Sequence, residues 1–176
     1  MSIFRPQVTH KSPKWSAFRK FEIPDLDSPL ETYLTRYILV RTPWFAIYVH
    51  RMDGPDSRKV LHDHPWNFFS LILRGGYTEY VGNHEWNIGP DPVIVHERHR
   101  VDWWTYKRAE DSHYIDLLHA DPTWTLVFTG RRRRNWGYWD NDGKWYPFDA
   151  HPTITADFDR ATRIRKQYDE LHKDPS

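Results

Sequence analysis

Two histidines stand two residues apart in the run LHDHPW at residues 61–66. In a β-strand, the side chains of residues i and i+2 project from the same face, and the residue between them points the other way. His62 and His64 would therefore point together, and their ring nitrogens could bind one divalent cation at about 2.0–2.2 Å. Pro65 lacks a backbone donor and helps to end the strand. The pair predicts part of a metal site, although two surface histidines near a turn would give the same pattern.

A third ligand would complete the site, and several residues compete for that position. His99 opens the run HRVDWW, which is predicted as a strand. His96 lies three residues earlier, so strand alternation puts the two side chains on opposite faces. Glu79, in the run YTEYV, could instead complete the two-histidine, one-carboxylate set of many non-haem Fe(II) oxygenases, or add a fourth ligand. We favour His99, with His113 as the first reserve.

The chemistry of such a site depends on the metal. Neutral imidazoles suit Fe(II), Zn, Ni or Cu, and the sequence does not choose among them. Three ligands leave positions open for a substrate, for water or for O₂, so iron would permit oxygen activation and zinc would permit Lewis-acid catalysis. Each ligating histidine should pass its second N–H to an acceptor, for which Asp102 and Asp116 are candidates. Arg36 and Arg41 could hold a substrate carboxylate bidentately.

The elements that must position these residues are short β-branched and aromatic runs separated by turn signals. They predict an all-β sandwich or barrel. The runs are YILVR, WFAIYVHRM, KVLHDH, NFFSLIL, YTEYV, PVIVH, HRVDWW, YIDLL and TWTLVFTG. Gly75-Gly76 has the chemistry of a two-residue hairpin loop, which would place Glu79 opposite Ile72. Residues 141–143, Asn-Asp-Gly, predict a second hairpin between WGYW and KWYPF.

The two ends of the chain differ from this middle part. Residues 1–21 carry basic residues and no acidic residue, and we expect an irregular arm over the body. Near the C-terminus, apolar residues recur with the helical period and predict a helix packed on the outside of the barrel. They are Ile154, Phe158, Ala161, Ile164, Tyr168 and Leu171. The expected organisation is an arm at 1–30, a barrel at 31–150 and a helix at 151–176.

The order of HxH, strand, glycine turn and later histidine-bearing strand resembles the cupin superfamily. Cupins are small barrels of the RmlC-like double-stranded β-helix, or jelly-roll, type that bind a divalent metal inside. The resemblance covers about residues 36–130. Phe68 and Phe69 stand where cupins usually carry a glutamate, four or five residues after the second histidine. The second cupin motif is degenerate, because Gly89, Pro90 and Pro92 do not have its usual spacing.

Within the cupins, the pattern is most similar to thiol dioxygenases of the cysteine dioxygenase type, which use three histidines on Fe(II) without the glutamate. The resemblance implies His62, His64 and His99 as metal ligands and Arg36 as the residue that holds a substrate carboxylate. It implies an Fe(II) dioxygenase of a small, carboxylate-bearing molecule, with O₂ as co-substrate. The Ser–His–Tyr arrangement of those enzymes is not evident, and the comparable run here is TLVFT at 125–129.

Composition narrows the remaining choices. The chain has 176 residues, which suits one domain, and 25 Lys+Arg against 24 Asp+Glu give no strong attraction to nucleic acid or anionic lipid. The absence of cysteine excludes disulfides, cysteine-ligated zinc, iron–sulfur clusters and a thiol nucleophile. No apolar run reaches the ~18 residues of a membrane span, and no secretory signal is visible. We therefore expect a cytoplasmic protein without a membrane partner.

Two other functions stay open from the sequence. One is a non-redox metal cupin, such as a sugar or keto-acid isomerase or epimerase. The other is a non-catalytic cupin that binds a ligand, or nucleic acid through the basic run Arg131–Arg134. Acidic neighbours such as Asp140 and Asp142 would equally pair with that run. A homodimer is also compatible with the sequence.

Overall fold

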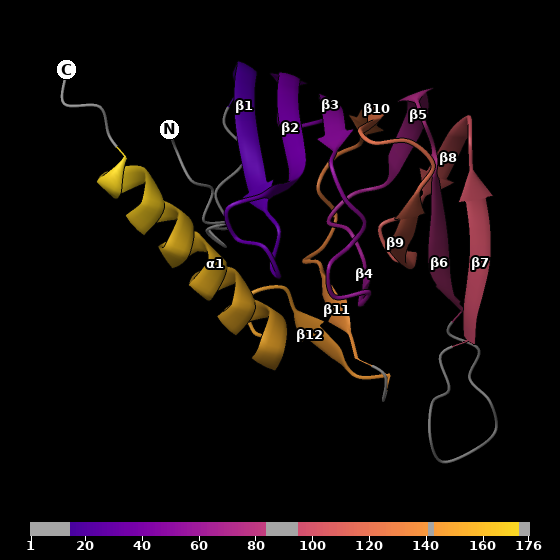
Figure 1. Cartoon of the computed structure of the whole chain (residues 1–176). Coiled ribbons are helices and arrows are strands. Elements are labelled where there is room, and N and C mark those ends of the chain that lie inside the picture. The colour runs from indigo at the N-terminus through magenta and orange to yellow at the C-terminus, as the bar shows by residue number, and fades with distance from the viewer. Residues whose placement is uncertain (1–14, 84–94, 141–142, 173–176) are drawn as a thin grey trace.

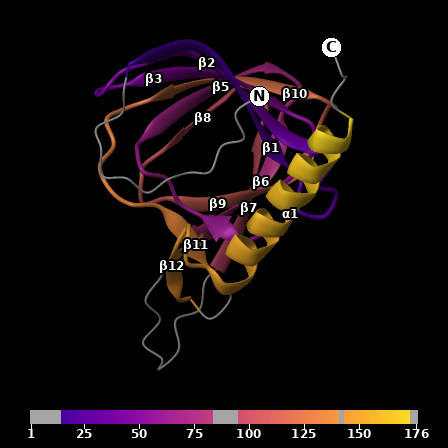
Figure 2. The ribbon, with the colours of Figure 1, turned by 90° about the vertical axis from the view of Figure 1, so that its left-hand side faces the viewer.

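Two antiparallel sheets face each other and enclose the interior of the molecule (Figures 1 and 2). The computed structural model describes residues 15–83, 95–140 and 143–172. In this part of the chain, the first sheet, sheet A, has the order β1 (Ser16–Pro24), β2 (Thr32–Arg41), β3 (Ala46–Met52), β10 (Thr123–Thr129), β5 (Phe68–Arg74), β8 (Trp104–Lys107). Sheet B has the order β12 (Trp145–Pro147), β11 (Gly137–Trp139), β4 (Leu61–His62), β9 (Ser112–Leu118), β6 (Tyr77–Asn83), β7 (Val95–Val101).

The strand order is that of a jelly roll. From β3 to β6 the chain alternates between the two sheets, and from β7 to β10 it returns and places its strands between or beside the earlier ones. The result is β3-β10-β5-β8 in one sheet and β4-β9-β6-β7 in the other, the double-sheet arrangement that cupins share. The expected all-β, cupin-like jelly-roll barrel with a C-terminal helix is confirmed.

The core lies between the sheets because alternate residues of each strand point inward. In β10, for example, the residues at 123, 125, 127 and 129 are buried, and those between them are more exposed. Buried residues form two clusters. One contains Leu34, Met52, Tyr77, Val101 and Ile115, and the other contains Ile38, Ala46, Tyr48, Phe68 and Val127. Members of both clusters line the interior pocket described below.

The glycine pair at 75–76 does not close a hairpin, contrary to the sequence-based prediction. Strands β5 and β6 belong to different sheets, so the pair carries the chain from one sheet to the other. Both glycines have positive φ, at 83° and 130°, which explains the residue type. As a consequence, Glu79 does not lie opposite Ile72: it pairs with His99 and Ile115, and Ile72 pairs with Thr125.

The expected irregular N-terminal arm is wrong for residues 16–21. Residues 1–14 lie outside the described residues, and Ser16–Pro24 forms strand β1, which pairs along its length with β2. Phe21 packs against the second of the two buried clusters, which contains Ile38 and Phe68. An apolar residue within the basic segment therefore attaches β1 to the barrel. The strand boundaries also differ from the two runs predicted at 92–96 and 99–104, because β7 ends at Val101 and β8 begins at Trp104.

The predicted C-terminal helix is confirmed as α1 (Pro152–Leu171), which lies against the outside of the barrel (Figure 1). Its side chains at Ile154 and Ala161 are buried. Arg165 donates to Glu22 and Thr32 and so ties the helix to β1 and β2. The predicted second hairpin is present as β11 paired with β12. Among the described residues, no helix has the length and apolar character that crossing a membrane would require.

Candidate metal centre

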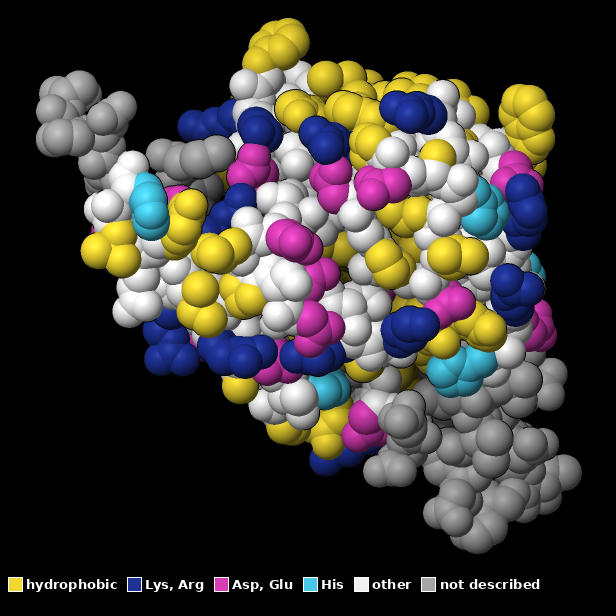
Figure 3. Space-filling view, viewed as in Figure 1, with side chains coloured by type: hydrophobic (Ala, Val, Ile, Leu, Met, Phe, Trp, Pro, Cys, Tyr) yellow, Lys and Arg dark blue, Asp and Glu magenta, His cyan; other side chains and the backbone are white. Residues whose placement is uncertain are grey.

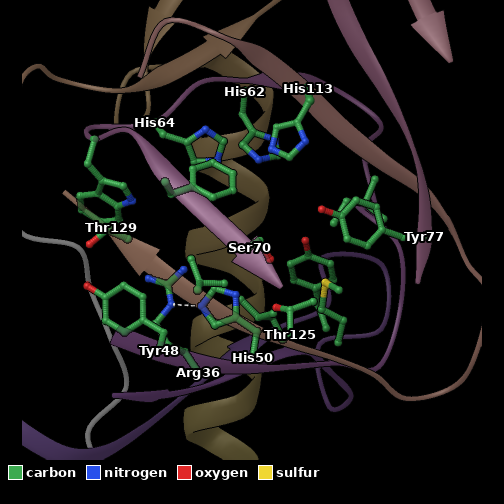
Figure 4. A pocket seen from close by; sticks show the side chains of 17 residues that line it. Arg36, Tyr48, His50, His62, His64, Ser70, Tyr77, His113, Thr125 and Thr129 are labelled. Atoms are coloured by element: carbon green, nitrogen blue, oxygen red, sulfur yellow. Dashed lines mark hydrogen bonds between the residues drawn. The ribbon is translucent and has the colours of Figure 1, made fainter. Parts of the chain in front are cut away.

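Three histidines of sheet B converge on one point inside the barrel (Figure 4). His62 ends β4, His64 lies two residues beyond it, and His113 lies in β9 opposite His62. One ring nitrogen from each lies within 4.8 Å of the others. The ring centroids are 5.2 Å apart for His62 and His64, 4.9 Å for His62 and His113, and 5.0 Å for His64 and His113.

The residue between the two motif histidines points away from them and anchors the segment. Asp63 is fully buried, and it accepts hydrogen bonds from the backbone N–H of Gly137 at 2.7 Å and from the indole Nε1 of Trp145 at 2.9 Å. Arg134 makes an ion pair at 3.0 Å with Oδ2, the carboxylate oxygen that also accepts from Trp145. Asp63 thus points away from the two histidines, as expected for the HxH motif, although the strand predicted to contain the motif ends at His62. The central aspartate fixes β4 against the β11–β12 hairpin.

The third histidine is held from behind by a buried carboxylate. His113 Nδ1 lies 2.5 Å from Oε2 of Glu79, and Nζ of Lys107 donates to the other carboxylate oxygen at 2.5 Å. Burial raises the pKa of Glu79, but the hydrogen bonds and charges of His113 and Lys107 bring it down to about 2. An ionised carboxylate at Nδ1 leaves Nε2 of His113 free as a ligand atom, as in carboxylate–histidine pairs that support metal ions.

A second carboxylate lies beside His62. The Asp56 carboxylate is 3.9 Å from Nδ1 of His62, and it accepts hydrogen bonds from the Tyr33 hydroxyl and from the backbone N–H of Ile115. This carboxylate is therefore fixed by groups on β2 and β9. Asp102 and Asp116, the acceptors considered from the sequence, lie elsewhere and pair with Arg100 and Lys59.

The electrostatics of the group fit a cation. Burial lowers the pKa of His62 to about 4, and burial with the nearby His113 and His62 holds the pKa of His64 well below its ordinary value. Both rings are therefore neutral at pH 7, the form that binds metals. Nδ1 of His64 is buried without a hydrogen-bond partner among the described residues. A divalent cation bound where the three rings converge would give this buried imidazole a partner.

The structure does not bring His99 to this group, and His113 occupies the place expected for it. His99 lies in β7, the edge strand of sheet B, opposite Glu79. It shares a face with Glu79, but β6 separates it from β9, and two strand spacings amount to about 10 Å. Its side chain is 50% exposed and contacts Glu97. Glu79 is turned to His113 and Lys107, so its predicted role as a ligand becomes a supporting one.

A cavity of about 130 Å³ opens beside the three histidines and is closed on its far side by sheet A. Arg36 lies on this far wall, where its Nε donates to Nε2 of His50 at 2.9 Å and its guanidinium lies 5.0 Å from the ring centre of Tyr48 (Figure 4). Burial lowers the pKa of His50 well below its usual value, and the Arg36 charge acts in the same direction. His50 is therefore a neutral acceptor.

The far wall also carries hydroxyl groups. Ser70, Thr125 and Thr129 are buried and line the cavity, with Phe68 and Val127 as apolar neighbours. In the sheet register, Arg36, His50 and Thr125 are direct cross-strand neighbours on β2, β3 and β10. This wall can therefore bind a polar, oxygen-bearing group, and the facing wall carries the three imidazoles.

The sequence predicted Arg36 as part of the site but did not indicate His50, which contacts Arg36, or Lys107, which contacts Glu79. His50 has the same strand parity as Tyr48 and Met52, which predicts an inward side chain, but no spacing to another histidine singled it out. Lys107 lies in β8, and the strand predicted from the run HRVDWW stopped before it. The other candidate arginines are not part of the cavity wall. Arg41 ends β2, and Arg134 of the basic run makes an ion pair with Asp63.

No protein-family model and no curated protein sequence matches this chain. Among solved structures, it is similar to hydroxypropylphosphonic acid epoxidase from S. wedmorenis, with 16% identity, a TM-score of 0.39, and coverage of 56% of this chain and 50% of that one. This chain thus spans about half the length of the epoxidase. It is also similar to an RmlC-like cupin from Shewanella frigidimarina (14% identity, TM-score 0.39, 58% and 79% covered) and to KdgF from Halomonas sp. (16%, 0.39, 57% and 81%). By its own strand order, the chain is a cupin-like jelly roll.

Proposed function

We propose that this protein is a metal-dependent enzyme, an Fe(II) oxygenase of a small anionic substrate, with His62, His64 and His113 as the metal ligands. One observation carries the proposal: one ring nitrogen from each of the three histidines lies within 4.8 Å of the others, at the wall of an interior cavity. The lowered pKa values of His62 and His64 support it, because protonated imidazoles would repel a cation. The unpartnered Nδ1 of His64 supports it as well.

When bound, a divalent metal would supply Lewis acidity at the cavity wall and, as iron(II), an affinity for O₂. The residues of the chain do the rest. Glu79 holds the ring of His113 in one orientation through Nδ1 and keeps its Nε2 directed at the site. Lys107 neutralises the Glu79 charge from behind, so the buried carboxylate does not need a second cation. Phe68 and Val127 add an apolar part to the cavity lining.

The substrate class follows from Arg36. Its guanidinium faces the cavity, and its Nε donates a hydrogen bond to neutral His50. Among the described residues, no carboxylate lies within ion-pair distance of Arg36. A partly buried cation without a counterion favours an anionic ligand, and two guanidinium nitrogens remain for a bidentate contact with a carboxylate. The cavity volume of about 130 Å³ restricts this ligand to a small molecule.

Metal analysis of untagged protein tests the ligand set. We expect about one divalent metal ion per chain in the wild type, and its loss in folded His62→Ala and His113→Ala variants. His99→Ala is the matched control, because His99 is exposed and remote from the group. Metal retained by both site variants, or lost equally in the His99→Ala variant, would contradict the proposal.

Oxygen consumption tests the reaction class. Protein loaded with Fe(II) should consume O₂ only when a small carboxylate-bearing substrate is present. The Arg36→Met variant should raise KM for that substrate and leave the metal content unchanged, since Arg36 is on the opposite wall from the histidines. Turnover of a substrate under strictly anaerobic conditions would instead indicate the non-redox isomerase or epimerase reaction.

A further inference from the structure

The outer surface of sheet A is apolar over four neighbouring strands. The outward positions of β3, β10, β5 and β8 carry apolar side chains, apart from Arg51 on β3 and Arg74 at the end of β5, which pairs with Trp124. We define the apolar face by its central and most exposed members, which are Phe69, Leu71, Leu73, Trp104, Tyr106 and Phe128. Hydrophobic side chains gather along the corresponding top side of the molecule in Figure 3.

Strand register makes these side chains contiguous. Leu71 pairs with Trp104 on β8, and Phe69 pairs with both Tyr106 on β8 and Phe128 on β10. The Phe69 ring stacks on Trp104 with centroids 5.8 Å apart. Trp104 is 61% exposed, and Tyr106 and Leu73 are each 52% exposed. An antiparallel sheet with one face on the core normally has a polar outer face, so this arrangement needs a cover.

The outer face of sheet B provides the contrast within the same molecule. There the outward positions include Asp116, which pairs with Lys59, and the charged residues Arg98 and Arg100 of β7. At the edge of the apolar face, Arg51 on β3 pairs with Asp53, and beyond β2 Lys20 pairs with Glu22 on β1. An apolar centre with a charged rim is the anatomy of a protein–protein interface.

We propose that the apolar face is a self-association surface, and that two copies of this chain pack face to face through it. The face carries no charge at its centre, so a second copy meets no like-charge repulsion. Aromatic side chains contribute roughly 150–250 Å² each when fully buried, and five members of the face are between about a third and two thirds exposed. The face therefore offers roughly 500 Å² per copy, and a pair buries about the ~1,000 Å² that a specific interface requires.

Residues 1–14 are too poor in apolar side chains to cover the apolar face. They contain only Ile3, Phe4 and Val8 as large apolar residues besides Met1, against six apolar residues at the centre of the face, five of which are exposed. A second copy instead presents the same face, and a two-fold axis makes such a contact self-complementary. Sheets that pack in this way align within about 30° of each other.

Sedimentation velocity of the full chain across the micromolar range tests the proposal. Wild-type protein should sediment with twice the 21.4 kDa chain mass, and the Leu71→Arg/Leu73→Arg variant should sediment as one chain. Leu117→Arg is the matched control and should remain dimeric, because Leu117 is also 52% exposed but lies on β9 of sheet B. Circular dichroism in the near ultraviolet establishes that each variant is folded.

Three results would overturn the proposal: a monomeric wild type, a folded Leu71→Arg/Leu73→Arg variant that stays dimeric, or dissociation caused equally by Leu117→Arg. If the double variant does not fold, Trp104→Glu replaces it. Trp104 lies on the edge strand β8 and is largely exposed, so its side chain contributes little to the core. A dimeric Trp104→Glu variant would likewise overturn the proposal, and a monomeric one would support it.

Discussion

At the scale of single residues, the buried pair of Glu79 and Lys107 is the strongest support of the candidate metal centre. Glu79 is 1% exposed and contacts both Lys107 and His113. Replacing Glu79 with glutamine keeps an oxygen for Nδ1 of His113 but leaves Lys107 as a buried cation without a counterion. We expect a loss of about 3–5 kcal/mol in the free energy of unfolding, and a metal affinity reduced about 10–100-fold. Urea unfolding and metal titration measure the two effects.

The double variant Glu79→Gln/Lys107→Met separates these effects. It removes both charges, so most of the lost unfolding free energy should return, since the penalty arises from one unpaired buried charge. The reduced metal affinity should persist because the carboxylate behind His113 is still absent. A double variant as unstable as Glu79→Gln would show that Lys107 is not the group that Glu79 neutralises.

The limits of sequence reasoning at this scale follow from where each ligand lies. His62 and His64 are two residues apart, and strand alternation alone predicts that their side chains point together. His113 is distant in the sequence and meets them only because β9 pairs with β4, which no local pattern reveals. His99 pairs directly with Glu79, but its strand lies at the edge of the sheet and its side chain is exposed.

At the scale of elements, Asp63 connects β4 to the β11–β12 hairpin. It is fully buried, accepts hydrogen bonds from Gly137 and Trp145, and makes an ion pair with Arg134. In an Asp63→Ala variant these donors lose their acceptor, and each unsatisfied buried group costs about 1–3 kcal/mol. We expect a loss of at least about 3 kcal/mol in unfolding free energy and a lower metal content, because His62 and His64 flank the residue.

Asp27→Ala is the control for this prediction, since Asp27 makes a solvent-exposed ion pair with Arg58. Its effect on unfolding free energy should stay within about 1 kcal/mol. Denaturant titration compares the two variants, and elemental analysis gives their metal content. Equal effects of the two substitutions, or an Asp63→Ala variant with wild-type stability, would contradict the anchoring role of Asp63.

The β11–β12 hairpin depends on a glycine for a steric reason. A Cβ at Gly137 would lie 1.9 Å from the backbone oxygen of Tyr146 on the partner strand. Gly137→Ala should therefore separate the two strands and cost about 1–3 kcal/mol or more of unfolding free energy. Gly54→Ala is the matched control, because no atom lies within 4 Å of its Cβ position and its effect should stay within about 0.5 kcal/mol. Thermal unfolding of both variants decides the comparison.

Element types followed from local patterns more readily than sheet membership did. The alternating runs predicted most strands, and the helical period predicted α1. Gly75-Gly76 has the residue types of a hairpin turn, yet the strands that it joins lie in opposite sheets. The positive φ values explain why glycine occurs there, but residue types do not specify which sheet the next strand enters. Strand β1 was missed because its basic residues conceal the inward-facing Phe21.

At the scale of the whole molecule, a metal ion would link the stability of the barrel to metal concentration. The three histidines converge only in the folded chain, because His113 reaches the other two through the pairing of β4 and β9. A ligand that binds the folded form alone stabilises it by about 2.7 kcal/mol at 100 times its Kd. In a domain of this size each kcal/mol raises Tm by about 2–4 °C, so saturating metal should raise Tm by roughly 5–10 °C over chelated protein.

Scanning calorimetry of the wild type and a His64→Ala variant, each with and without a chelator, measures this shift. The variant should show no rise, since it lacks one of the three converging rings. An equal rise in both proteins would place the stabilising metal elsewhere, and no rise in the wild type would contradict binding at this centre.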